Sequence, residues 1–112
     1  MRKIIALDLD GVLNTYDGKY DKNKISPIKN GAKEFLSKLA ENYDIEIFTV
    51  REKNLVYKWL KDNNIIQYIK TVTDIKNPRT TIFIDDRALN FCGDFNKTLK
   101  EVENFTPHWK NE

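Results

Sequence analysis

Two carboxylates, Asp8 and Asp10, stand where the largely apolar stretch of residues 3–9 ends, and Gly11 follows them directly. The stretch is too short for a helix and too apolar for a surface strand, so it predicts a strand that is buried on both faces. Buried charge is costly unless it is paired or binds a metal. The alternative is a solvated strand end with an ordinary Asp-Gly turn. The apolar residues before the pair favour a cation-binding active site.

A second pair of acids, Asp85 and Asp86, closes another largely apolar run, residues 80–84. Acidic side chains also stabilise the start of a helix, so a helix cap is the alternative explanation for this pair. Oxygen ligands of this kind suit a hard divalent cation, and Mg²⁺ is the expected cofactor. The sequence thus holds two pairs of carboxylates, each at the end of a predicted strand.

Alternating strands and helices must bring these acids together. Thr49 ends the second predicted strand, and Lys76 lies in the loop after the third. The alternation predicts an α/β fold, a Rossmann-like three-layer α/β/α arrangement with a mostly parallel central sheet of about four strands. Such sheets carry their active sites at the carboxyl ends of the strands. The predicted strands are residues 3–9, 45–50, 68–72 and 80–84, and the predicted helices are residues 26–41, 52–63 and 96–104.

The connecting segments are short. The turn-rich residues 14–25 predict a mobile loop or a small hairpin, and the Ser-Pro pattern at residues 26–27 predicts the start of the next helix. Residues 105–109 are expected to pack back on the body. Within them, His108 is expected to be a packed or solvated tail residue and not a catalytic one. Cys92 is expected to be a small buried apolar side chain.

The whole chain of 112 residues fits one domain, residues 1–112. Its 19 lysines and arginines and 17 acidic residues are well mixed and give a net charge of +2, which only weakly indicates nucleic-acid binding. The single cysteine excludes an internal disulfide and suits a reducing cytoplasm. The sequence shows no secretory signal pattern and no run of ~20 apolar residues. We therefore expect a cytoplasmic protein without a membrane span; the oligomeric state is left open.

Together these residues resemble the motifs of the haloacid dehalogenase-like (HAD) superfamily of phosphohydrolases. Residues 8–13 are similar to its first motif, residues 47–49 to the second, Lys76 to the third and residues 84–86 to the fourth, in the family's order. Residues 83–87 are also similar to the phosphatase domain of phage polynucleotide kinases. Larger members insert a cap domain after the first or the second motif. The short gaps here imply a small member with no cap domain and an open site.

The resemblance implies a Mg²⁺-dependent phosphatase, a phosphoric monoester hydrolase that works through an aspartyl-phosphate. Asp8 would attack phosphorus, and Asp10 would protonate the leaving oxygen and then activate water. Two carboxylates at this spacing repel each other by about 3 kcal/mol at an effective dielectric of ~20. With Mg²⁺ holding Asp8 ionised, this repulsion is expected to keep Asp10 protonated. One residue type would thus provide both an acid and a nucleophile.

The resemblance also implies roles for the remaining residues. Thr49 would hydrogen-bond a phosphoryl oxygen, and Lys76 would neutralise negative charge, with Lys70 or Arg79 as alternatives for that role. Of the fourth-motif pair, Asp86 is the expected direct metal ligand. The alternative for Asp85 is to hold Lys76 or a water bound to the metal, without binding the metal itself. The residues expected to contact substrate are Gly11, Thr49, Arg51 and Arg87, with a surface ion pair as the alternative for either arginine. The expected Mg²⁺ ligands are Asp8, Asp10 (through its backbone carbonyl), Asp85 and Asp86.

Nucleotides or nucleic-acid ends that carry a phosphate are the expected substrate class, on the similarity to the polynucleotide kinase phosphatase domain. Two other functions are left open. One is a non-catalytic module that binds a phosphorylated ligand or partner on the same fold. It would predict loss of Asp8, Asp10 or Lys76, and all three are present. The other is a phosphotransferase, which passes the phosphoryl group to an acceptor other than water.

Overall fold

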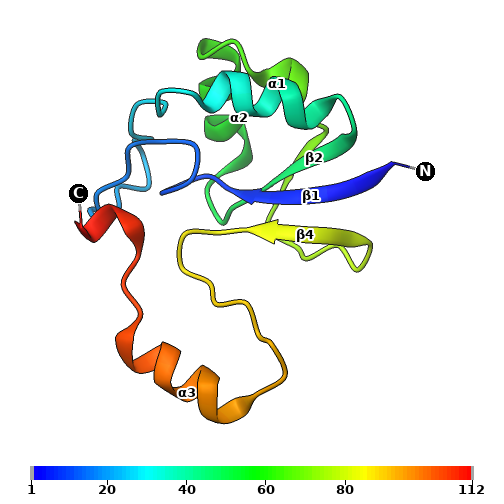
Figure 1. Cartoon of the computed structure of the whole chain (residues 1–112). Coiled ribbons are helices and arrows are strands. Elements are labelled where there is room, and N and C mark those ends of the chain that lie inside the picture. The colour runs from blue at the N-terminus through cyan, green and yellow to red at the C-terminus, as the bar shows by residue number, and fades with distance from the viewer. Residues whose placement is uncertain (1, 112) are drawn as a thin grey trace.

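The chain folds around a central parallel sheet (Figure 1). The computed structural model describes residues 2–111. Its elements, in chain order, are β1 (Lys3–Asp8), α1 (Ala32–Ala40), β2 (Tyr43–Phe48), α2 (Lys53–Asp62), β3 (Thr71–Thr73), β4 (Thr80–Ile84) and α3 (Phe95–Asn104), with short 3₁₀ helices at Ile66–Tyr68 and His108–Asn111. None of the helices in this described stretch combines the length and the apolar character that crossing a membrane requires.

β1 lies inside the sheet, whose strand order is β3-β2-β1-β4 with every neighbouring pair parallel. The register places Leu7 of β1 beside Ile47 of β2 on one side and Ile84 of β4 on the other. The carboxyl ends of these three strands therefore meet at one edge of the sheet. The predicted α/β, Rossmann-like fold with about four parallel strands is confirmed, and the described residues include no cap domain.

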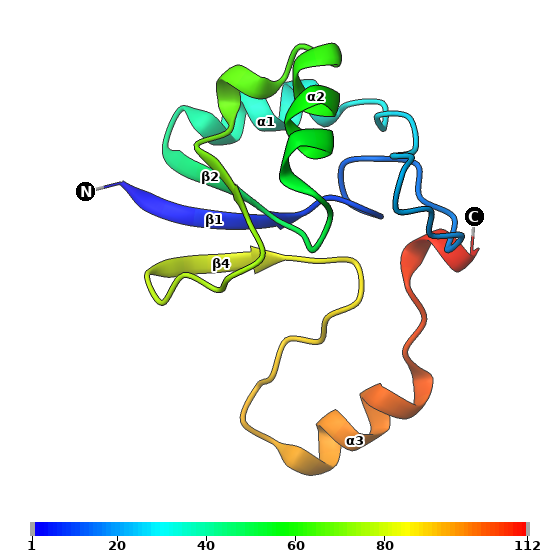
Figure 2. The same ribbon diagram turned by 180° about the vertical axis from the view of Figure 1, so that it is seen from behind.

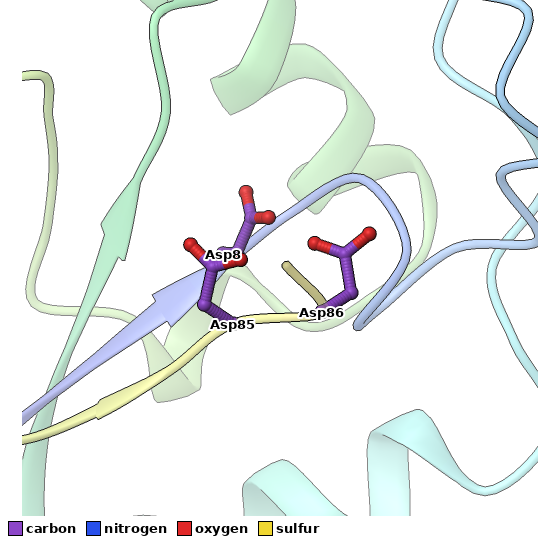
Figure 3. A group of neighbouring side chains, drawn as sticks. All are labelled: Asp8, Asp85 and Asp86. Carbon is purple, nitrogen blue, oxygen red and sulfur yellow. The ribbon is translucent and has the colours of Figure 1, made fainter. Parts of the chain in front are cut away.

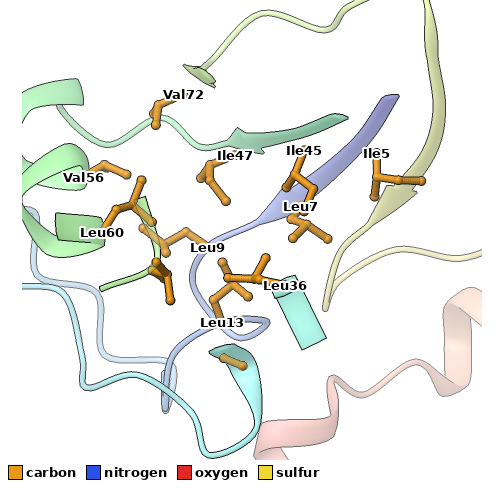
Figure 4. Close-up of a cluster of buried hydrophobic side chains, with 12 residues drawn as sticks. Ile5, Leu7, Leu9, Leu13, Leu36, Ile45, Ile47, Val56, Leu60 and Val72 are labelled. Atoms are coloured by element: carbon orange, nitrogen blue, oxygen red, sulfur yellow. The ribbon is translucent and has the colours of Figure 1, made fainter. Parts of the chain in front are cut away.

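The core lies between one face of the sheet and the helices α1 and α2 (Figure 4). Because side chains alternate along a strand, Leu7 faces this core while its neighbour Asp8 does not. Leu7, Leu36 and Leu60 are fully buried. This apolar packing holds β1 in register and so places Asp8 at the open end of the sheet. The buried cluster consists of Ile5, Leu7, Leu9, Leu13, Ala32, Leu36, Ile45, Ile47, Val56, Leu60, Ile65 and Val72.

α3 stands apart from the sheet, on the far side of β4 from α1 and α2, in both views of the chain (Figures 1 and 2). Its apolar stripe, Phe95, Leu99 and Val102, is 77%, 63% and 59% exposed, and α3 has no buried residue. The helical spacing of these residues correctly predicts a helix. It says nothing of what the helix packs against, and here α3 adds little to the core.

Two leucine-to-alanine substitutions test this arrangement. Leu60→Ala removes a fully buried side chain of α2 and is expected to lower the free energy of unfolding by about 2–5 kcal/mol. Leu99→Ala removes a side chain of α3 that is 63% exposed and is expected to cost less than about 1 kcal/mol. Urea denaturation followed by circular dichroism measures both. Losses of equal size would show that α3 packs into the core in solution.

The segment before α1 differs from the sequence prediction. The Ser-Pro pattern predicts a helix from residue 26, but α1 begins at Ala32. Ile28 instead pairs with Asn14 in an antiparallel bridge, so the backbone there bonds across the chain and not along a helix. Gly31, with a φ of 90°, then makes the left-handed turn into α1. Residues 15–27, between the two bridge partners, form a loop that this isolated bridge closes, and they contain no paired strands of a hairpin.

Two smaller predictions are also wrong. Cys92 is exposed and not buried, because the segment that follows β4 leaves the body of the protein (Figure 1). The third strand begins at Thr71 and not at residue 68, because Ile66–Tyr68 forms a 3₁₀ helix that uses the backbone differently.

Candidate active site

Three carboxylates gather at the carboxyl ends of β1 and β4 (Figure 3). Asp8 is the last residue of β1, and Asp85 and Asp86 follow β4 directly. Each offers one oxygen atom, and these oxygens lie within 4.8 Å of one another. The parallel pairing of the two strands causes this, because Leu7 and Ile84 stand side by side and the strands then end together.

The three carboxylates repel one another. Burial, contact with Asp86 and the charge of Asp85 raise the pKa of Asp8 to about 8. Burial acts to raise the pKa of Asp86 as well, but the neighbouring Asp8 carboxyl and the indole of Trp109 outweigh it, so the pKa of Asp86 is lowered. Without a cation, the carboxyl of Asp8 therefore holds a proton more readily than that of Asp86. A bound cation would take the place of that proton.

The donor set of this cluster fits a hard divalent cation. Carboxylate oxygens are the ligands that Mg²⁺ takes. Asp86 Oδ2 accepts a hydrogen bond from Trp109 Nε1 at 2.5 Å, whereas its Oδ1 is buried and has no hydrogen-bond partner among the described residues. A buried carboxylate oxygen without a partner costs free energy. A cation held by Asp8, Asp85 and Asp86 would satisfy this oxygen.

Asp10 lies outside this cluster and faces a different partner. Its carboxylate accepts from Arg51 Nε at 2.7 Å and from Arg51 Nη2 at 3.0 Å, and the Asn14 amide donates to Oδ1 at 3.0 Å. The Arg51 side chain is 2% exposed, so this bidentate pair is shielded from solvent. The sequence argument makes Asp8 the charged neighbour that keeps Asp10 protonated. In the structure, the charged group that contacts the Asp10 carboxylate is instead the buried guanidinium of Arg51.

Arg51 is held from several sides. Its Nη1 donates to the carbonyl of Asp21 at 2.8 Å, and its guanidinium lies 4.6 Å from the centre of the Tyr20 ring. Its backbone N–H donates to the hydroxyl of Thr49 at 3.2 Å. Arg51 therefore ties the loop of residues 14–25 to the end of β2. A direct contact with substrate would require Arg51 to give up these partners, and the alternative of an exposed surface ion pair is wrong.

A cavity of about 170 Å³ brings together most of the predicted site residues. It combines carboxylates and a hydroxyl with aromatic and apolar walls. Thr49, at the end of β2, is 7% exposed, so its hydroxyl is fixed at the wall of this cavity. The predicted site residues that line the cavity are Asp8, Asp10, Thr49, Asp85 and Arg87, and the lining is completed by Tyr16, Tyr20, Phe48 and Val50.

Gly11 joins the first motif to the fourth. Its φ of 86° lies in the left-handed region, and a Cβ at this position would lie 2.2 Å from Asp86 Oδ2. Glycine is therefore required both for the backbone angle and for the close approach of Asp86. The N–H of Gly11 donates to Asn14 Oδ1 at 3.0 Å. This N–H thus serves the loop, and a contact between Gly11 and substrate stays a prediction.

Lys76 borders the acidic cluster from another side. It lies in a neighbouring cavity of about 220 Å³ that Asp8 and Asp85 also line. Its ammonium nitrogen is 5.3 Å from the centre of the Phe83 ring and has no carboxylate within ion-pair distance among the described residues. Lys70, one of the alternatives, instead forms an ion pair at 3.0 Å with the carboxylate of Asp44, near the amino end of β2. The geometry therefore suits Lys76 better than Lys70 for the third-motif role.

Two residues that the sequence analysis does not single out also reach the site. Asn14 is 1% exposed and links the turn at Gly11 to Asp10. An amide side chain just after an Asp-Gly turn is a typical source of such bonds, so a local signal was present. Trp109 binds Asp86, and the adjacent His108 places Nε2 2.7 Å from the Gly11 carbonyl, 97 residues away in the chain. The sequence predicts that residues 105–109 pack back on the body, but no local pattern predicts which residues they contact.

Comparison with known proteins gives no independent indication of a family. No protein-family model, curated protein or solved structure matches the chain. The resemblance to the HAD superfamily therefore rests on the motif residues of the sequence alone.

Proposed function

We propose that the chain is a Mg²⁺-dependent phosphomonoesterase that works through an aspartyl-phosphate on Asp8. The observation that carries the proposal is the cluster of Asp8, Asp85 and Asp86, whose ligand oxygens lie within 4.8 Å of one another at the carboxyl edge of a parallel sheet. The unpartnered oxygen of Asp86 supports it, because that atom calls for a positive partner. The order of the four motifs along the chain supports the reaction type.

Each residue around the cavity then has a chemical task. When bound, Mg²⁺ would neutralise charge on the phosphoryl group and keep Asp8 ionised. An oxygen of Asp8 forms a bond to phosphorus while the bond between phosphorus and the leaving oxygen breaks. The hydroxyl of Thr49 donates to a phosphoryl oxygen, and Lys76 supplies positive charge from the neighbouring cavity.

Asp10 transfers protons in this scheme, and its ion pair with Arg51 affects the two proton transfers differently. As a carboxylate at the cavity wall, Asp10 can take the proton of the water that hydrolyses the aspartyl-phosphate. In the first step it must instead give a proton to the leaving oxygen, and a proton on Asp10 would break the bidentate pair with Arg51. Leaving groups that depart without protonation, such as aryl oxides, are therefore expected to react faster than alkyl leaving groups.

The proposed substrates are phosphates at the end of a nucleotide or a nucleic acid. Tyr16, Tyr20 and Phe48 line the cavity, and aromatic rings of this kind provide surfaces on which a base can stack. Arg87 at the same cavity is exposed and offers positive charge to a neighbouring phosphate. Residues 2–111 form no cap domain over the site, so a bulky substrate can approach it.

A panel of phosphorylated substrates, with and without Mg²⁺, tests the proposal. It includes nucleotides, 3′-phosphorylated oligonucleotides, sugar phosphates and an aryl phosphate. Wild type is expected to release phosphate only with Mg²⁺, Asp8→Asn to stay at background, and Asp44→Asn to match wild type, since Asp44 lies near the amino end of β2. Equal background for wild type and Asp8→Asn on every substrate would refute the proposal. Mg²⁺-dependent binding of a phosphorylated compound without turnover would favour the binding module.

Asp10→Asn tests the two-step scheme. With an aryl phosphate, whose leaving group departs without a proton from Asp10, the variant can still form the aspartyl-phosphate but cannot activate water. The kcat is therefore expected to fall by about 10²–10⁴-fold while phosphorylated protein accumulates. Intact-mass spectrometry after rapid acid quench detects the aspartyl-phosphate, and the double variant with Asp8→Asn serves as the unphosphorylated control. An Asp10→Asn variant with unchanged kcat would remove Asp10 from the mechanism.

A further inference from the structure

The C-terminal tail segment, residues 105–111, returns to the candidate site after α3. In both views it ends against the loop that follows β1 (Figures 1 and 2). Pro107 is buried, and His108 Nε2 lies 2.7 Å from the carbonyl of Gly11. Trp109 then donates its indole N–H to Asp86 Oδ2 at 2.5 Å. The tail therefore contacts both the first and the fourth motif.

The indole of Trp109 is packed tightly on the loop side. Its ring meets the ring of Tyr16 edge to face, with centres 5.3 Å apart. A Cβ on Gly18 would lie 2.8 Å from the Trp109 ring, and one on Gly11 would lie 3.0 Å from its nitrogen. The two glycines thus leave the space that the indole occupies. A side chain held in this way fixes the direction of its N–H.

We propose that Trp109 is a positioning residue for the cation site, because its indole binds one oxygen of Asp86 and leaves the other, buried and unpartnered, for the cation. An indole can only donate, so it engages Oδ2 as an acceptor and cannot take the place of a ligand. The bond from Trp109 thereby orients the Asp86 carboxylate, with Oδ1 left as the oxygen that has no other partner. This inference rests on the cation site of the proposed function.

The consequence is measured as Mg²⁺ affinity. Partners that orient a metal ligand typically contribute 10–100-fold to metal affinity, so Trp109→Phe is expected to raise the Kd for Mg²⁺ by about that factor. Phenylalanine keeps an aromatic ring against Tyr16 and Gly18 but has no N–H. Isothermal calorimetry with Mg²⁺ alone gives the Kd without any substrate. The thermal midpoint without Mg²⁺ records the purely structural effect of the substitution separately.

Trp109 also provides a spectroscopic readout. The chain has two tryptophans, and the other, Trp59, donates to the carbonyl of Ser26 at 3.2 Å. In a Trp59→Phe background, Trp109 is the sole indole, and its emission is expected to change saturably as Mg²⁺ binds Asp86. The midpoint of that change should equal the calorimetric Kd of the same variant. Adding Asp86→Asn should abolish the change.

The outcomes separate the two proposals. Mg²⁺ binding with equal Kd in wild type and Trp109→Phe, or a silent Trp109 emission while calorimetry detects binding, overturns the positioning role and leaves the cation site intact. A lower metal-free thermal midpoint for Trp109→Phe at unchanged Kd likewise shows a structural brace only. If wild type binds no Mg²⁺, the cation site of the proposed function fails, and the role of Trp109 fails with it. A weaker Kd together with the emission change supports the inference.

Discussion

Asp8→Asn is expected to abolish the proposed phosphatase activity and, at the same time, to stabilise the metal-free protein at alkaline pH. Activity should fall by at least about 10³-fold, because an amide cannot serve as the nucleophile that forms the aspartyl-phosphate. The free energy of unfolding should rise because the wild-type carboxyl is partly buried beside two other carboxylates, which disfavours its ionised form. Burial, contact with Asp86 and the charge of Asp85 raise the pKa of Asp8 to about 8.

The direction of the stability effect follows from the pKa of Asp8 in the two states. Because the ordinary value is 3.8 and the folded value is about 8, Asp8 favours folding at low pH, and this contribution is lost as the pH rises from 3.8 to about 8. For a half-buried, partly screened group we expect a loss on the order of 1–2 kcal/mol. Asp8→Asn carries no titrating group at this position and escapes the loss.

Thermal unfolding in EDTA at about pH 5 and about pH 8.5 measures the effect. The midpoint of Asp8→Asn should fall less than that of wild type between the two conditions, and Mg²⁺ at the higher pH should raise the wild-type midpoint more. Asp62→Asn is the matched control, since Asp62 lies in an exposed pair with Lys58, and it should shift stability by less than about 0.5 kcal/mol. If the thermal midpoints of Asp8→Asn and wild type change equally with pH, ionisation of Asp8 does not destabilise the fold.

The parts of the fold that the sequence predicts are those set by local periodicity. The continuous apolar run predicts β1 as a strand buried on both faces, and Ile5, Ala6 and Leu7 are all buried; helical spacing marks α2 and α3. The prediction fails at residue 26, because the pairing of Asn14 with Ile28 is a contact across the chain that overrides a favourable Ser-Pro start. Periodicity also cannot say that the apolar stripe of α3 stays exposed.

The candidate site likewise has contacts that the sequence predicts and contacts that it does not. Parallel strands in register end together, so motifs at strand ends predict that Asp8 meets the Asp85-Asp86 pair, and Thr49 joins them at the cavity. The partner of Asp10 is not predictable by this route, because Arg51 reaches it through the conformation of a loop and lies 41 residues away. No repeating pattern in the sequence predicts the direction of a side chain within a turn.

The pair of Asp10 with Arg51 gives the other large expected effect, a loss of about 3–5 kcal/mol in the free energy of unfolding for Arg51→Met. The substitution leaves the Asp10 carboxylate without its cation in a place where the two side chains are 16% and 2% exposed. It also frees the carbonyl of Asp21 and the ring of Tyr20, so the loop wall of the cavity loses its tie to β2. Arg51→Lys keeps the charge but not the fork and should recover less than half of the loss, on the order of 1–2 kcal/mol.

Urea denaturation of matched variants isolates this pair. Lys58→Met breaks the pair with Asp62, which has the same 2.7 Å separation but side chains 73% and 59% exposed, and should cost less than about 0.5 kcal/mol. The double variant Arg51→Met with Asp10→Asn leaves no unpaired charge, so it should be more stable than the sum of the single losses predicts, by about 1–3 kcal/mol. If Arg51→Met costs no more than Lys58→Met, the buried pair is absent in solution. Asp10 would then be free to carry the proton that the first step of the proposed reaction needs, so the same measurement decides between a fixed base and a mobile acid at this position.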